Sequence, residues 1–142
     1  MRALLLVHAA ATLFMAGVIW FVQIIHYPLF SLVGPERFSV YAGRHQRLAL
    51  RLLGVPMLVE LASAIALAAR ISTDPGRTLA RVGLALLLLI WISTAVFQRP
   101  RPRRLLRGFD PGVQRGLLIS NWLRTAAWTA RGLIALAMLA PC

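Results

Sequence analysis

Four apolar runs divide the chain, and each is long enough to cross a lipid bilayer as a helix. A spanning helix needs about 20 apolar residues. The runs cover roughly Leu4–Pro28, Leu48–Ala69, Val82–Phe97 and Leu117–Leu139, and the third becomes a helix over 79–97 when the preceding residues extend it. The pattern predicts an all-α fold, a four-transmembrane-helix bundle that forms a single domain over residues 1–142.

The segments between the runs predict three connections of different character. The first loop, Ser31–Arg47, carries Phe38 and Tyr41 among charged residues, which predicts a short interfacial segment. The second, "ISTDPGRT", is a compact turn, and the third, Gln98–Arg115, is strongly basic. Pro56 falls inside the second run, where proline favours a kink.

Polar residues recur at helical spacing inside the apolar runs. In the first run one stripe contains His8, Thr12, Met15, Ile19, Gln23 and His26. The stretch "NWLRTAAWTAR" likewise places Asn121, Arg124 or Thr125, Trp128 and Arg131 on one face. The spacing predicts that Gln23 and His26 point the same way, into the bundle.

Glu60 lies near the middle of the second apolar run. A carboxyl group at membrane depth must be protonated, paired or coordinated. Arg124 and Arg131 of the last run are the expected partners. A structural ion pair and a catalytic or coupling role are both open at this point.

The composition is that of a membrane protein, and in this context the high net charge indicates contact with lipid head groups. The chain is 59% hydrophobic with a mean hydropathy of +0.74, and 14% of its residues are charged, against about 25% in ordinary soluble domains. The net charge of +12 comes from arginine and lies mainly in short loops, as for loops that face anionic lipid. Membrane lipid is therefore the expected partner, and nucleic acid is not.

The arginines are distributed unequally between the two ends of the predicted bundle. Ten belong to the first and third loops and their borders: Arg37, Arg44, Arg47, Arg51, Arg99, Arg101, Arg103, Arg104, Arg107 and Arg115. Four belong to the other end: Arg2, Arg70, Arg77 and Arg81. The positive-inside rule predicts a multi-pass protein of a cell inner membrane, with these two loops in the cytoplasm and both termini outside it.

The polar residues that are candidates for catalysis or binding lie in the predicted cytoplasmic half of the bundle. We expect catalytic roles for His26, Tyr27 and Glu60, and a metal set of His26, His45 and Glu60. Residues expected to bind a substrate are Gln23, Tyr41, Gln98, Asn121, Trp122 and Arg124. Two histidines and a carboxylate suit a transition metal, and either histidine suits haem as an axial ligand. A headgroup-boundary position for His26 and Tyr27, and an interhelical hydrogen bond for Gln23, are the alternatives.

Several stretches carry a resemblance to a known group. They are "GVIWFVQIIHYPLF", "FSVYAGRHQR", "VPMLVE", "WISTAVFQRP", "RGFD" and "NWLRTAAWTAR". Together they resemble a family of small four-helix bacterial membrane proteins, mostly uncharacterised, in which the "QRPRP" region often reads Gln-x-Pro-x-His; here Pro102 replaces that histidine. The architecture is similar to that of the anthrone-oxygenase-like and the haem-binding protoporphyrinogen-oxidase-like membrane proteins, which implies redox chemistry on a hydrophobic substrate.

Two functional hypotheses follow. The first is an oxidoreductase or oxygenase that acts on a hydrophobic or amphiphilic small molecule in a polar cavity near the cytoplasmic face, with a metal or haem. The alternative is an oligomeric carrier or binding protein for an amphiphilic molecule, with Glu60 as the coupling group. A structural subunit of a larger complex is a third option.

Overall fold

The computed structural model describes residues 1–98 and 110–140, and this part of the chain is helical apart from short turns. Its elements are α1 (Arg2–Phe21), the π-helical turn η1 (Val22–His26), the 3-10 turn η2 (Pro28–Leu32), α2 (Pro35–Arg70), α3 (Gly76–Ser93), the π-helical turn η3 (Thr94–Gln98) and α5 (Pro111–Leu139). The all-α class is confirmed.

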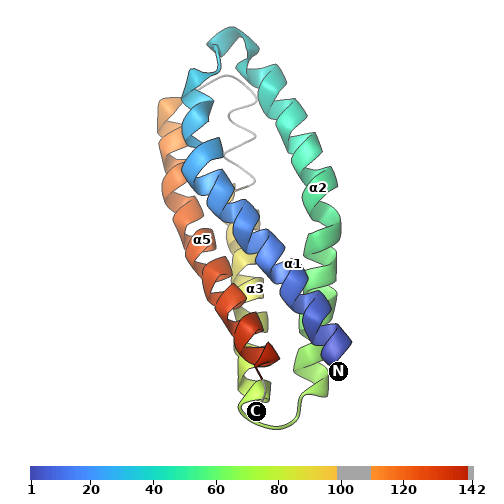
Figure 1. The fold of residues 1–142 in the computed structure, drawn as a ribbon. Helices are drawn as coiled ribbons and strands as arrows, with labels where there is room; N and C mark the ends of the chain where they lie inside the picture. The colour runs from blue at the N-terminus through green and yellow to red at the C-terminus, as the bar shows by residue number, and fades with distance from the viewer. Residues whose placement is uncertain (99–109, 141–142) are drawn as a thin grey trace.

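The four long helices form an elongated bundle (Figure 1). α1 packs against α2 and α5, and α3 packs against the same two helices. The start of α1, the α2–α3 turn and the end of α5 lie at one end of the bundle. Three of the described helical segments, Arg2–Leu32, Glu36–Arg70 and Gly76–Val96, are long and apolar enough to cross a membrane.

α2 differs from the expectation of a loop followed by a shorter helix. It begins at Pro35, which suits the first turn of a helix, and continues without interruption through Pro56 to Arg70. The early part has its own helical pattern: Phe38 and Ala42 are buried in a cluster with Phe30 and Leu117. The charges that suggested a loop, such as Arg44 and Arg47, are exposed. Residues 35–47, which the sequence pattern assigned to a loop, are therefore the first part of one continuous helix.

α1 ends in a change of helical geometry. The Tyr27 amide donates to the Val22 carbonyl, 3.0 Å away, which is the i→i+5 bond of a π turn. Pro28 then begins a 3-10 turn. The π turn adds a residue to the helical repeat just where the polar stripe reaches Gln23 and His26.

The predicted stripe on α1 is confirmed for five of its positions, since His8, Thr12, Met15, Ile19 and Gln23 are all buried. Met15 and Ile19 belong to the central apolar cluster with Ile90, Ala127 and Trp128. The outer faces carry exposed apolar side chains: Leu6, Phe21, Ile24, Leu52, Leu58, Ile92, Leu123 and Leu133.

Candidate functional site

A buried ion pair joins three helices of the bundle. The Arg131 guanidinium on α5 donates to Oε1 of Glu60 on α2 through Nη2 at 2.8 Å and Nε at 3.1 Å, and through Nη1 to the Gly83 carbonyl on α3. Glu60 is 0% exposed and Arg131 is 1% exposed. Charges removed from water this completely must be matched by geometry of this quality. The predicted pairing of Glu60 with Arg131 is confirmed.

A chain of polar contacts continues from this pair toward the other end. Trp128 Nε1 donates to Glu60 Oε2 at 3.3 Å, and the Arg124 guanidinium carbon lies 5.2 Å from the Trp128 ring centre. Arg124 Nη1 donates to Asn121 Oδ1 at 3.1 Å, and Asn121 Nδ2 donates to Gln23 Oε1 at 2.8 Å. This polar network connects six inward side chains: Gln23, Glu60, Asn121, Arg124, Trp128 and Arg131.

Two further polar contacts lie outside this network, and neither pair was predicted from the sequence. His8 Nδ1 lies 2.9 Å from the Ser63 hydroxyl, and Gln114 donates to the Tyr27 carbonyl at 2.9 Å. His8 starts the predicted α1 stripe, and Gln114 lies two helical turns before Asn121. The helical spacing of polar positions therefore contained the signal for both.

His26 points away from this network and toward α2. Its ring centre lies 4.3 Å from that of His45, with the ring planes 35° apart. Among the described residues, no group hydrogen-bonds with His26 Nε2, which is buried. The π turn explains the direction, because the extra residue rotates His26 away from the face on which Gln23 meets Asn121. The expectation that Gln23 and His26 share one face fails for this reason.

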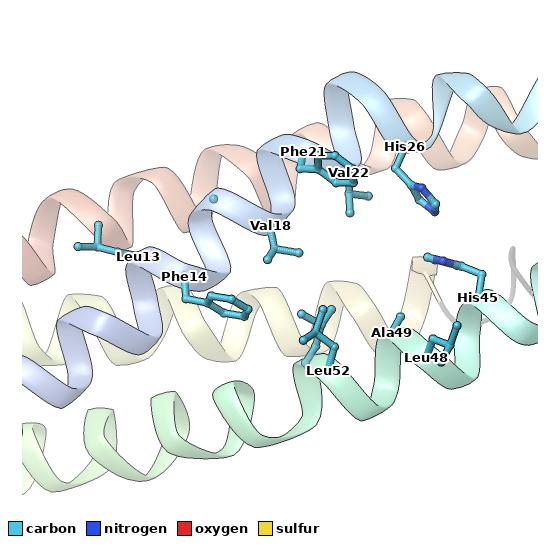
Figure 2. A pocket seen from close by; sticks show the side chains of 12 residues that line it. Leu13, Phe14, Val18, Phe21, Val22, His26, His45, Leu48, Ala49 and Leu52 are labelled. Atoms are coloured by element: carbon cyan, nitrogen blue, oxygen red, sulfur yellow. The ribbon is translucent and has the colours of Figure 1, made fainter.

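An apolar cleft of about 610 Å³ extends from the two histidines along the gap between α1 and α2. Figure 2 shows His26 and His45 pointing toward each other from opposite helices, with apolar side chains beyond them. The apolar lining consists of Leu13, Phe14, Gly17, Val18, Phe21, Val22, Leu48, Ala49, Leu52 and Leu53. Its volume is within the range of small-molecule sites, about 300–1,000 Å³.

A second cavity, named here the inner cavity, has a volume of about 290 Å³ and also borders His45. His45, Ala49 and Leu53 line both spaces, so the two adjoin along α2. The inner cavity is also lined by Tyr27 at the end of η1 and by Thr94, the first residue of the second π turn. It therefore extends from His45 to Tyr27, whose backbone carbonyl accepts a hydrogen bond from Gln114.

The structure separates the predicted metal set. His45 and Glu60 are fifteen residues apart on one continuous helix, which is about 22 Å at the usual rise. Within residues 1–98 and 110–140 no group of three or more histidine, cysteine or acidic residues comes together. Glu60 therefore belongs to the ion pair, and the histidines form a separate pair.

The remaining predicted residues divide between the interior and the surface. Tyr41 stacks near His45, with ring centres 6.3 Å apart. Trp122 is 49% exposed and packs edge-on against Trp20 on the outside of the bundle, away from both cavities. Gln98 ends η3, and its side chain lies outside the described residues, as does Pro102.

Comparison with known proteins finds no family model, no curated protein and no solved structure that matches the chain. The resemblance to small four-helix bacterial membrane proteins therefore stays a prediction. The geometry of the cavities and of the polar network carries the functional argument.

Glu60→Leu and Arg131→Met should each lower the free energy of unfolding by about 3–5 kcal/mol, because each leaves a buried charge without its partner. The double variant should lose much less than the sum of the two, since it removes both charges together. Chemical denaturation in detergent, followed by helicity, measures this. Arg77→Ala, which breaks the exposed ion pair with Asp74, is the control and should leave the free energy of unfolding almost unchanged, because water screens this pair. Additive losses in the double variant would contradict the coupling.

Proposed function

We propose that this is an integral membrane protein that takes an amphiphilic small molecule from the bilayer into the cleft between α1 and α2. The observation that carries the proposal is the composition of the cleft: two histidines at one end and apolar side chains along the rest. An apolar chain would occupy the length of the cleft and the polar head would meet the imidazoles. Such a division into apolar walls and a few polar groups is usual for ligand sites.

The proposal includes four spanning helices in a cell inner membrane. α5 would be the fourth, although Arg124 and Arg131 interrupt its apolar sequence. Arg131 is buried against Glu60, whereas Ile119, Leu123 and Leu133 form an exposed apolar surface. Charged residues in spanning helices typically face the bundle interior in this way. The excess of arginines at the end that bears the first and third connections supports a cytoplasmic location for the histidines.

A metal-dependent oxidoreductase or oxygenase is the second candidate function. It is favoured by the contact of His26 with His45 and by the free, buried Nε2 of His26, which no described residue engages. Imidazole nitrogens bind zinc, copper and iron, and the other ligands would be water or the bound molecule. A porphyrin does not fit between rings 4.3 Å apart, so haem would use only one of the histidines.

The carrier alternative with Glu60 as coupling group has less support. Glu60 accepts from Arg131 and Trp128 and lines neither of the two cavities beside His45. A coupling carboxylate must exchange protons or cations with an accessible path. The cleft, rather than Glu60, is the better place for binding.

Gly17→Phe should block binding of the amphiphile. Gly17 lines the cleft, and a Cβ built there meets no atom within 4 Å, so the new ring fits the chain but occupies the ligand's space. We expect photo-crosslinking of a diazirine-bearing long-chain alcohol to α1 and α2, in bilayer nanodiscs, to fall by about tenfold, as for an overpacking cost of about 1–3 kcal/mol. Gly54→Phe is the matched control, because Gly54 is equally open and is outside the cleft. Equal crosslinking in both variants would refute the cleft as the site.

A reporter at the C-terminus tests the orientation. With both termini outside the cytoplasm, a C-terminal alkaline phosphatase fusion should be active and a C-terminal β-galactosidase fusion inactive. Fusions after residue 74, in the α2–α3 turn, should behave in the same way, because this turn lies at the same end of the bundle (Figure 1). The reverse pattern would invert the proposed topology.

Metal content tests the second candidate function. Elemental analysis and an optical spectrum of the purified protein should show near-stoichiometric zinc, copper or iron, which His26→Ala and His45→Ala should each remove. His8→Ala is the control, because His8 forms a hydrogen bond with Ser63 toward the opposite end of the bundle from His26 and His45. Metal content that survives in both test variants, or its absence from the unmodified protein, would leave the binding proposal without a metal centre.

A further inference from the structure

Arg124 carries a charge inside the bundle without a carboxylate to balance it. Its guanidinium contacts the Asn121 side-chain oxygen, the Trp128 ring and the Tyr27 hydroxyl. Its Nε is buried, and no group in the described part of the chain accepts from it. These neighbours are neutral, so they solvate the guanidinium in part and leave its charge uncompensated.

The acidic residues of the chain are too few to supply the missing charge. The sequence contains four, and all of them lie in the described ranges. Glu60 pairs with Arg131, and Asp74 pairs with Arg77 in the distant α2–α3 turn.

The other two acidic residues are engaged or exposed elsewhere. The Asp110 carboxylate caps α5 by accepting from the amides of Gly112 and Val113. Glu36 is exposed in the first turn of α2. In the described part of the chain, none of the four acidic side chains is therefore placed to pair with Arg124.

Tyr27 connects this charge to the space where a ligand would lie. It lines the inner cavity beside His45 and contacts Arg124, which does not itself line either cavity. We propose that Arg124, together with Tyr27 and Asn121, binds an anionic head group of the amphiphile. This inference rests on the proposed function. The alkyl chain of the amphiphile would occupy the cleft between α1 and α2, and its head group would pass the histidine pair into the inner cavity.

The chemistry of the site favours a carboxylate or a phosphate. A guanidinium presents several N–H donors in one plane, which match the oxygens of these groups. Arg124 has Nε free of an acceptor among the described residues, and the Tyr27 hydroxyl can donate beside it. A neutral alcohol head group would leave the charge of the Arg124 guanidinium without a counter-ion.

The test uses the full-length protein in phosphatidylcholine nanodiscs. Three photoreactive probes share one alkyl chain and differ in the head group: a carboxylic acid, an alkyl phosphate and a primary alcohol. At a pH at which the acid is ionised, at least one anionic probe should bind about tenfold or more tightly than the alcohol, as expected for a hydrogen bond to a charged group. The better of the two anionic probes identifies the head group. Lowering the pH until the acid is protonated should remove its advantage.

Arg124→Gln should abolish the preference for the anion and leave the affinity for the alcohol unchanged. Arg115→Gln is the matched control, because Arg115 is an exposed arginine of the same helix. Arg124→Lys should keep most of the preference, and Tyr27→Phe should reduce it several-fold. The last two variants decide the question if Arg124→Gln does not fold.

The outcomes separate this inference from the function on which it rests. Equal affinities for acid, phosphate and alcohol, all abolished by Gly17→Phe, would overturn the anionic head and retain the cleft. An anion preference that persists in Arg124→Gln or is lost in Arg115→Gln would show attraction by surface arginines and would also overturn the inference. A lack of crosslinking to α1 and α2 by any probe would overturn the proposed function itself.

Discussion

The bundle depends on the constraint that a charge buried away from water needs a partner of opposite charge held in good geometry. The Glu60–Arg131 pair meets this constraint by joining α2 to α5, while the same guanidinium reaches the Gly83 carbonyl of α3. His8 and Ser63 join α1 to α2 nearby. Removing either charge would leave the other exposed to apolar surroundings, at a cost much larger than that of an ordinary surface substitution. Polar contacts in this part of the bundle therefore link all four long helices.

The distribution of interhelical hydrogen bonds also explains where the bundle opens. Toward the other end, α1 is tied to α5 by Gln23–Asn121 and Trp20–Thr129. Between α1 and α2, the described residues show no comparable side-chain bond beyond His8–Ser63, and the histidine rings meet without one. Figure 1 shows α2 bowed away from α1 over this region. The cleft thus follows two helices whose printed side-chain hydrogen bond lies at one end, with mainly apolar residues along the rest of their contact.

The sequence predicted the parts of this arrangement that depend on periodicity and on the cost of buried charge. The α1 stripe and the inward face of α5 follow from a repeat of three to four residues, and the partner of Glu60 follows from the scarcity of alternatives. The start of α2 was missed because charged residues around Phe38 were interpreted as a loop, although apolar positions at helical spacing run through them. The metal set failed because a continuous α2 holds His45 and Glu60 far apart. The direction of His26 depends on a π turn, for which side-chain periodicity gives no signal.

The two π turns lie at the same end of the bundle, beside the cavities around His45. One, at Val22–His26, ends α1, and the other, at Thr94–Gln98, ends α3. Residues of both border the cavities around His45: His26 lines the outer one and Thr94 the inner one. A π turn is less stable than a regular α turn and persists where it places particular groups, which is why such turns concentrate at functional sites. Here one of them turns His26 toward α2 while Gln23 remains bonded to α5. The same local distortion therefore separates an imidazole that lines the cleft from the hydrogen bond between Gln23 and Asn121.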